Sequence, residues 1–337
     1  MDIAASIQKV TEEIMIKLAK AIRQEYNINN LCLAGGVALN CVANGKILKK
    51  RIFENIWIQP ASGDAGGSLG AALGYWHHEL NKLRKLNNKD KMKGSYLGPK
   101  YSNEIVESEL KKLNANFKKL EDDQITKNVA ELLADQKTVG WFQGKMEFGP
   151  RALGGRSILA DARSEQMQKE LNLKIKFRES FRPFAPSVLS EKVNNYFEFN
   201  GSSPYMLLVA DVKRNLRLKM TPDQEKLFGI EKLNVKRSTL PAITHVDYSA
   251  RVQTVHKETN PKYYNLINKF NELTGCSVLV NTSFNIRGEP IVCSISDAFR
   301  CFMGTNLDVL VCENFIMLKE DQDKNLKKNY QSEFELD

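Results

Sequence analysis

The sequence predicts a mixed α/β protein divided into two domains. Short apolar runs typical of buried strands alternate along the chain with amphipathic segments typical of helices. The chain has 337 residues, more than one domain usually holds, and its 42% of hydrophobic residues suffices for sizeable cores. A run rich in Lys, Asn and Asp at 80–98 separates two such regions, so we place a domain boundary there.

The composition narrows the class of protein. A net charge of +9 favours anionic partners, although nucleotides and phosphates satisfy it as well as nucleic acid does. The six cysteines form no CxxC pair and lie mostly in apolar segments, so we interpret them as reduced thiols. No apolar run is long enough to cross a bilayer and no secretory signal is evident, so we expect a cytoplasmic protein without a membrane partner.

The first region begins with a predicted amphipathic packing helix at 3–26. Its apolar positions are Ile7, Val10, Ile14, Leu18 and Ala21. A buried strand at 31–34 then enters Gly35 and Gly36, and a helix is predicted from 37 towards 48. A glycine turn between strand and helix exposes backbone donors that favour a phosphate group, although most such glycine pairs are only turns.

The next strand, at 55–59, leads into a segment of small residues, 62–72, which reads SGDAGGSLGAA. An acidic residue such as Asp64 among small residues lets a nucleotide or hydrated metal approach, although turn and cap roles are commoner. The histidines of the chain are His77, His78, His245 and His256. Their spacing does not offer two imidazoles from one helical face.

The second region is predicted to contain helices at 101–117 and 123–136, followed by a strand at 137–144. A helix and a closing strand are predicted within 297–318. The composition then turns polar and charged, so we expect a frayed tail.

Three polar clusters follow strand ends in this region. The first, 148–157, reads FGPRALGGRS, and its glycines let backbone N–H groups approach an anion beside the two guanidinium forks. The alternative is that these arginines are surface charges paired with nearby acids. The second cluster, 174–186, favours the anion site over paired surface charges, because its sequence KIKFRESFRPFAP interleaves cations with aromatics and prolines. If it is extended, Lys174, Lys176 and Arg178 share one face.

The third cluster, 281–290, reads NTSFNIRGEP and follows a short apolar strand. Alone it is compatible with an ordinary polar turn. Together with other segments, the three clusters strongly resemble NodU/CmcH-type O-carbamoyltransferases. The segments that carry the resemblance are 34–40, 62–67, 148–163, 176–186, 246–255 and 281–291.

The resemblance spans nearly the whole chain and implies a fold and a chemistry. It implies part of a Kae1-like domain, of the actin and sugar-kinase type, followed by a YrdC-like α/β domain. Such proteins use ATP with Mg²⁺ and carbamoyl phosphate to make a carbamoyl-adenylate that carbamoylates a small hydroxyl acceptor. The expected units are the C-terminal half of a Kae1-like domain at 1–85, a linker at 86–98, a YrdC-like domain at 99–319 and a flexible tail at 320–337.

The resemblance also assigns roles to residues. Lys176, Arg178, Ser283 and Asn285 match the pairs that hold nucleotide phosphates and the carbamoyl group, and we expect them to act by charge neutralisation and positioning. No nucleophile with a base close in sequence is evident, which gives covalent catalysis little support. The expected substrate or nucleotide binders are Arg151, Arg156, Arg182, Arg251, Asn281, Gly35, Gly36, Asn40, Gly63 and Gly66.

For Arg251 the resemblance implies binding of carbamoyl phosphate, and the alternative is an exposed strand arginine. Gly155 stands where many relatives have a side-chain amide. Asp64 matches a metal ligand of the family, but the His-x-x-x-His pair that accompanies it there is absent from this sequence. We therefore expect Fe²⁺ or another divalent metal only if the missing histidines are supplied.

By this resemblance the chain begins in the middle of the transfer domain. It works with a separately encoded N-terminal half, or is a truncated gene product, or has lost the transfer step; we favour the first two equally. We rank a carbamoyl-activating enzyme first. A non-catalytic partner subunit of a separate transferase half ranks second, and a nucleic-acid-binding module ranks third. The open half-domain is covered by a second chain, by self-association of this chain, or not at all. The sequence leaves the acceptor open.

Overall fold

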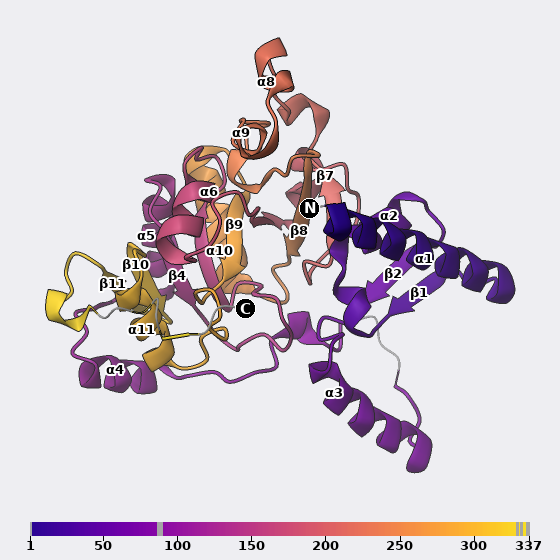
Figure 1. The fold of residues 1–337 in the computed structure, drawn as a ribbon. Coiled ribbons are helices and arrows are strands. Elements are labelled where there is room, and N and C mark those ends of the chain that lie inside the picture. The colour runs from indigo at the N-terminus through magenta and orange to yellow at the C-terminus, as the bar shows by residue number, and fades with distance from the viewer. Residues whose placement is uncertain (1, 86–89, 328–329, 331–332, 335–337) are drawn as a thin grey trace.

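The computed structural model describes residues 2–85, 90–327, 330, 333 and 334, and Figure 1 shows its ribbon. Two sheets of very different size organise these residues, one with two strands and one with nine. Helices alternate with strands in both parts of the chain. The prediction of a mixed α/β fold is therefore confirmed.

The nine-stranded sheet mixes parallel and antiparallel neighbours. In the order in which they lie side by side, its strands are β3 (Lys118–Lys119), β11 (Phe315–Leu318), β10 (Val309–Cys312), β4 (Val139–Phe142), β5 (Arg156–Asp161), β9 (Val278–Ser283), β6 (Ala185–Leu189), β8 (Ser249–Val255) and β7 (Leu208–Asp211). β10 is parallel to β4 and β6 is parallel to β8, whereas the other neighbours are antiparallel. This order brings strand ends that are distant in sequence side by side at the same end of the sheet.

Four longer helices accompany this sheet. α5 (Asp122–Ala134) and α10 (Pro261–Thr274) pack against each other and contact β5, β6 and β9, while α11 (Ile295–Gly304) contacts α4 (Asn103–Lys112), β4 and β10. α10 begins at Pro261 because the Asn260 side chain accepts the Tyr263 N–H, and it ends at Gly275 in the left-handed conformation. The shorter helices are α6 (Met167–Glu170), α7 (Val193–Tyr196), α8 (Pro222–Lys226) and α9 (Gly229–Leu233).

The two-stranded sheet belongs to a smaller N-terminal unit. β1 (Asn30–Leu33) and β2 (Asn55–Ile58) are parallel, as the intervening α2 (Cys41–Lys49) requires. α1 (Asp2–Tyr26) precedes them and α3 (Ala65–Gly74) follows. The separate core of this unit consists of Ala19, Leu31, Ile47 and Phe53.

α2 attaches the small unit to the edge strand β7. A Cβ atom added to Gly45 would lie 2.7 Å from the Val209 carbonyl oxygen, so the two backbones meet where a side chain does not fit. The Asn44 amide donates to the Leu207 carbonyl oxygen at 3.2 Å, and Lys49 pairs with Asp211 at 2.7 Å. These contacts make β7 the platform on which the small unit rests.

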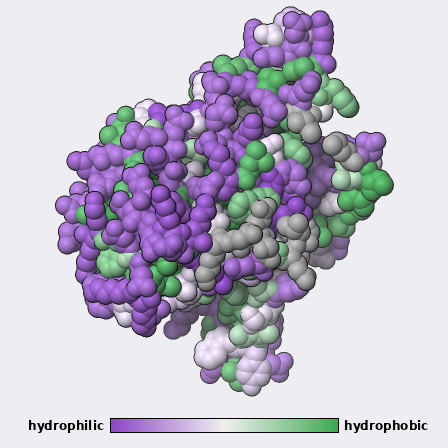
Figure 2. Space-filling model, turned by 60° about the vertical axis from the view of Figure 1, so that its left-hand side comes forward, coloured by the Kyte–Doolittle hydropathy of each residue, from purple (hydrophilic) through white to green (hydrophobic). Residues whose placement is uncertain are grey.

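The apolar face of α1 differs from the expectation of a packing helix. The helix forms as predicted and packs on α2 and the small core through Met15, Ile16 and Ala19, but its apolar face stays exposed among the described residues. Its residues, 42–83% exposed, are Ile3, Ile7, Val10, Ile14, Leu18 and Ile22. α3 likewise buries none of its residues, and it projects from the body in Figure 1. The same projection is largely white or green in Figure 2, which marks residues of intermediate or high hydropathy.

The predicted domain limits stay a prediction. Residues 86–89 of the expected linker lie outside the described residues, as do 328–329, 331–332 and 335–337 of the expected tail. Within that tail Gln322 and Tyr330 are buried, so the segment is not wholly frayed. Over the described ranges, no helix combines the length and apolar composition that a membrane span requires.

The loop between β4 and β5 depends on Gly154, which has a φ of +105°. An alanine Cβ there would lie 2.2 Å from the Tyr263 ring. We expect Gly154→Ala to lower the free energy of unfolding by about 2–4 kcal/mol, from backbone strain and overpacking together. Urea unfolding followed by circular dichroism measures this loss.

The matched control is Gly70→Ala, since Gly70 lies in α3 with open space around it. We expect this change to leave the unfolding free energy unaltered or to raise it, because alanine favours a helix. Equal effects of the two substitutions would contradict the role given to Gly154.

Candidate functional site

The predicted site residues come from strand ends that the sheet order brings together. In β9, Asn281 lies opposite Leu159 of β5 and Ala185 of β6. Ser283, the last residue of β9, lies opposite Ser157 near the start of β5. Antiparallel pairing thus gathers the end of β9 and the starts of β5 and β6 at one edge.

Lys176 is held by the segment that follows β9. Its ammonium donates to the Asn285 side-chain oxygen at 2.8 Å, to the Asn285 carbonyl oxygen at 2.8 Å and to the Ser283 hydroxyl at 3.2 Å. The Ser283 hydroxyl in turn donates to the Asn285 side-chain oxygen at 2.6 Å. Three of the four predicted catalytic residues therefore form one hydrogen-bonded cluster.

Lys176 is only 3% exposed and has no carboxylate partner among the described residues. Burial, together with the charge of the neighbouring Arg178, lowers its pKa to about 7, while Cys301 and Glu289 oppose the shift. An anion bound beside the ammonium would raise this pKa again. Lys176 is therefore poised to gain a proton when a phosphate arrives.

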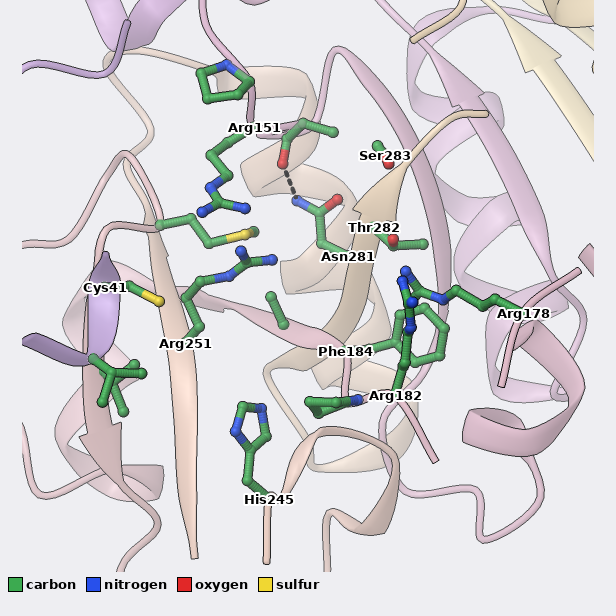
Figure 3. A pocket seen from close by; sticks show the side chains of 17 residues that line it. Cys41, Arg151, Arg178, Arg182, Phe184, His245, Arg251, Asn281, Thr282 and Ser283 are labelled. Carbon is green, nitrogen blue, oxygen red and sulfur yellow. Dashed lines mark hydrogen bonds between the residues drawn. The ribbon is translucent and has the colours of Figure 1, made fainter. Parts of the chain in front are cut away.

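Arg178, the fourth predicted catalytic residue, is oriented by two neighbours. Its Nε donates to the Asn172 side-chain oxygen at 2.7 Å, and its guanidinium lies 5.0 Å from the centroid of the Phe184 ring. Burial and the charge of Arg182 lower its pKa to about 10. Its side chain reaches the cavity of Figure 3, with Arg182 beside it.

The expected extended alternation of this segment is wrong. Residues 171–175 form a helical turn, and Phe177 has a φ of +50° between the two cations. Lys174 consequently points to solvent and pairs with Glu170 at 2.9 Å, whereas Lys176 is buried. The local helical turn overrides the period-two pattern that the sequence suggested.

Arg151 and Arg251 face a cavity of about 360 Å³. Figure 3 shows their guanidinium groups beside each other. The buried Nε of Arg151 has no hydrogen-bond partner among the residues that the structure describes, and an Nη donates weakly to the Leu39 carbonyl oxygen at 3.4 Å. Burial, with Arg151 as neighbour, lowers the pKa of Arg251 to about 10. No Asp or Glu is among the described residues that line the cavity, so it favours an anion.

A second cavity of about 450 Å³ adjoins the first. It is lined by Lys176 and Asn285, and it shares Arg178, Arg182 and Ser283 with the first. Because the shared residues lie between the two, we treat them as one basic basin. The basin contains eight of the predicted site residues, namely Arg151, Lys176, Arg178, Arg182, Arg251, Asn281, Ser283 and Asn285.

Asn281 combines a place in the cavity wall with a structural role. Its fully buried amide donates to the Ala152 carbonyl oxygen at 3.2 Å, the bond drawn in Figure 3, and to Ser187 and Gln253 at 3.0 and 2.8 Å. Its side-chain oxygen has no partner among the described residues. Asn281 therefore anchors the arginine loop to β9 and offers one acceptor.

Arg156 points away from the basin. It is fully buried and donates to backbone carbonyl oxygens, including those of Gly155 at 2.9 Å and Pro99 at 3.2 Å. Its guanidinium stacks 3.5 Å from the centroid of the Phe142 ring. The structure thus gives Arg156 contacts of a loop anchor, and it is not among the described cavity-lining residues.

The predicted residues of the small unit line neither cavity. They are Gly35, Gly36, Asn40, Gly63, Asp64 and Gly66. Asn40 instead caps α2 by accepting the Ala43 N–H at 3.1 Å, and it exchanges hydrogen bonds with Gln8. Cys41 and Val42, the first residues of α2, form part of the wall of the first cavity.

The metal predicted at Asp64 does not fit this chain by itself. Asp64 is exposed at the start of α3, and the described ranges contain no group of three His, Cys, Asp or Glu side chains that could hold a metal ion. One exposed carboxylate cannot supply the several ligands that a transition metal requires.

Two residues that sequence reasoning missed shape the basin. His245 lines the first cavity, and burial together with Arg251 lowers its pKa to about 4, against the opposing charge of Asp247. It is neutral near pH 7 and can exchange hydrogen bonds with a ligand. Its place six residues before the predicted strand arginine, Arg251, was an available signal.

The second is Glu147, which organises the loop that carries Arg151. Its buried carboxylate accepts the backbone N–H groups of Leu153 and Gly155 at 2.6 and 2.7 Å. Burial raises its pKa, against these donors. A side chain at Gly155 would meet the Lys145 carbonyl oxygen at 2.8 Å, which explains a glycine there.

The fold and basin together define a mixed α/β protein with a buried, carboxylate-poor anion site. The comparisons give its family. The "Carbamoyltransferase C-terminus" family matches residues 130–319, and the "Carbamoyltransferase N-terminus" family matches residues 1–73. The chain belongs to the carbamoyltransferase family.

Relatives match the chain along most of its length. Protein sll1178 of Synechocystis sp. is 60% identical over 100% of this chain and 55% of its own length, and nodulation protein NolO of Bradyrhizobium diazoefficiens is 40% identical over 94% and 54%. Nodulation protein U of Sinorhizobium fredii is 32% identical over 85% and 46%. The chain thus spans about half the length of the curated relatives it matches.

Among solved structures, the crystal structure of T. kodakarensis HypF resembles the chain with a TM-score of 0.32 and 18% identity, over 52% of this chain and 19% of that one. The strand order and pairing of this chain define its fold.

The neighbouring arginines of the first cavity generate a prediction about stability. Arg251→Met removes one of two like charges while retaining much of the volume, so we expect the ligand-free protein to gain about 1 kcal/mol. The variant should also lose the stabilisation that inorganic phosphate gives the wild type. Calorimetric unfolding with and without inorganic phosphate measures both effects.

The matched control is Arg84→Met, because Arg84 is exposed and lines neither cavity. It should respond to inorganic phosphate as the wild type does. The assignment fails if Arg251→Met keeps the full response to inorganic phosphate.

Proposed function

We propose that this chain carries the activating step of an O-carbamoyltransferase, in which carbamoyl phosphate and ATP give carbamoyl-adenylate. Water first hydrolyses the mixed anhydride bond of carbamoyl phosphate, which gives carbamate and inorganic phosphate. A carbamate oxygen then bonds to the α-phosphorus of ATP, and the bond to pyrophosphate breaks. Both substrates and both leaving groups are anions, which is the chemistry that a basic basin accommodates.

The observation that carries this proposal is the concentration of cations around two adjoining cavities. Lys176, Arg178 and Arg182 border the second cavity, and Arg151 and Arg251 face the first. Two separate phosphate-bearing substrates need two adjoining anion positions, and this basin provides them. Fixed cations stabilise charge on a leaving pyrophosphate without reorganisation during the reaction.

Within the basin we assign roles by position. Lys176 and Arg178 neutralise nucleotide phosphates, while the Ser283 hydroxyl and the Asn285 amide fix the orientation of Lys176 and of the carbamoyl group. Arg151 and Arg251 take the phosphate of carbamoyl phosphate. Magnesium would enter with the ATP phosphates, because Mg²⁺ is usually held by substrate oxygens and water with few protein ligands.

The YrdC-like character of the region after 98 and the Kae1-like character of the first 85 residues are part of the proposal. Transfer to a small hydroxyl acceptor is also proposed and not shown, because the chain spans only about half the length of these relatives. The six cysteines are all free thiols, which agrees with the proposed cytoplasmic location.

The second candidate function is that of a partner subunit for a separate transferase half. The exposed apolar face of α1 favours it, because a contiguous face of this kind marks an interaction surface. The two functions are compatible, since an activating subunit also needs its transferase half. A nucleic-acid-binding role has less support, because the cations converge in a cavity.

The activating step is tested by pyrophosphate release from ATP by the purified chain. We expect release to require carbamoyl phosphate and to fall about a hundredfold or more in the Lys176→Ala, Arg178→Ala double variant, because both phosphate-binding cations are lost. Lys174→Ala is the matched control, since Lys174 is exposed and pairs with Glu170. Release that persists in the double variant would overturn the assignment.

The transfer step has a separate prediction. We expect no acceptor-dependent carbamoylated product from this chain alone, because its described residues supply Asp64 without further metal ligands. Mass spectrometry of mixtures with candidate sugars and other hydroxyl compounds detects any product. Acceptor-dependent product formation by the isolated chain would show that the transfer site is complete.

A further inference from the structure

Tyr330 is an anchored residue in a polar C-terminal segment. It is 1% exposed, and its ring lies against Gly304 at the end of α11, where an added Cβ would come within 2.2 Å of the Tyr330 Cβ. The ring also meets Phe334 edge-on, with 5.4 Å between centroids. The Arg300 guanidinium lies 5.6 Å from its centroid.

The hydroxyl of Tyr330 donates to the Glu289 carboxylate, which is itself 94% buried. The other oxygen of that carboxylate accepts the Ile286 N–H at 2.8 Å. The backbone carbonyl of Glu289 accepts the Asn285 side-chain amide at 2.6 Å. Glu289 therefore closes the turn between 285 and 289 from both its side chain and its backbone.

This turn leads directly to the basin. The Asn285 side-chain oxygen, on the same amide that bonds Glu289, accepts the Lys176 ammonium at 2.8 Å. Three consecutive hydrogen-bonding steps thus connect Tyr330 to Lys176 through Glu289 and Asn285. Such a series of hydrogen bonds fixes the orientation of the Asn285 amide that Lys176 requires.

We infer that Tyr330 is a positioning residue for Lys176, and that the C-terminal segment is thereby part of the activating site. The inference rests on the proposed function for its consequence in catalysis. The Tyr330 hydroxyl holds the Glu289 carboxylate, the carboxylate holds the turn, and the turn holds the Asn285 amide against the ammonium. Removing the hydroxyl loosens this arrangement while the ring still fills its place.

The electrostatic consequence has a definite sign. Burial raises the pKa of the Glu289 carboxyl, while the Tyr330 hydroxyl, the Ile286 N–H, Cys301 and Arg300 oppose the rise. Loss of the hydroxyl therefore makes Glu289 easier to protonate. The groups that act on Lys176 are Arg178, Cys301 and Glu289, and the Glu289 carboxylate supports its ammonium. A carboxylate that moves with the loosened turn, or that gains a proton more easily, supports the ammonium less, so we expect the pKa of Lys176 to fall.

The experiment compares Tyr330→Phe with wild type in the full chain. Trace acetylation with acetic anhydride, mapped by peptide mass spectrometry, reports the neutral fraction of Lys176. A fall of about half a pH unit in its pKa makes labelling at about pH 6 roughly threefold faster. The alkaline limb of kcat/KM for pyrophosphate release should move to lower pH by the same amount.

Tyr264→Phe is the matched control, because the Tyr264 hydroxyl also donates to a glutamate, Glu191, at 2.6 Å, but Glu191 lies outside the basin. It should leave both readouts unchanged. Glu289→Gln removes the same charge, so it should shift Lys176 in the same direction and should not add to Tyr330→Phe in the double variant.

The inference is overturned if Tyr330→Phe and Tyr264→Phe give the same Lys176 labelling profile. Failure of the proposed function is a different result, because wild type would then release no pyrophosphate while the labelling profiles of the two variants still differ. A fold defect is recognised by a lowered unfolding midpoint together with altered labelling of lysines remote from the basin.

Discussion

The site depends on the cost of burying positive charge without carboxylate partners. That cost is seen in the lowered pKa values of two cations, about 7 for Lys176 and about 10 for Arg251. Carbonyl, amide and ring contacts hold these cations in place but do not cancel their charge. An anion that enters the basin supplies the missing partner, so ligand binding and relief of repulsion are the same event.

Complementary backbone contacts hold the loop that completes this basin. Arg156 is a buried cation satisfied by carbonyl oxygens, and Glu147 is a buried carboxylate satisfied by N–H groups of the same loop. The loop is therefore shaped by charge–dipole contacts on both sides of its backbone. Its glycines permit this, because Gly154 takes a positive φ and Gly155 leaves no room for a side chain. Arg151 is displayed by a scaffold that uses no regular secondary structure.

Local patterns predicted several of the strands, among them those at 31–34, 55–59 and 137–144, and the family resemblance indicated the residues of the central cluster. Other strands, such as β5, β6 and β7, were not predicted. Lys176, Arg178, Ser283 and Asn285 do come together. The inward direction of Arg156 was not predictable, since a glycine-rich loop carries no periodicity that tells which way a side chain points. The positive φ of Phe177 likewise broke an alternation that assumed an extended chain. Tyr330 was missed because an isolated aromatic in a polar tail gives no local signal of a contact 41 residues away.

The attachment of α2 to β7 has a mechanical consequence for the basin. One wall of the arginine cavity, at Cys41 and Val42, belongs to a unit that has its own core of four buried residues. The opposite walls belong to the nine-stranded sheet. The cavity thus lies between two packed units, which meet in the backbone contact of Gly45 with Val209. Because α1 packs on α2 and α2 packs on β7, any displacement of the small unit would move Cys41 and Val42 relative to Arg151 and Arg251.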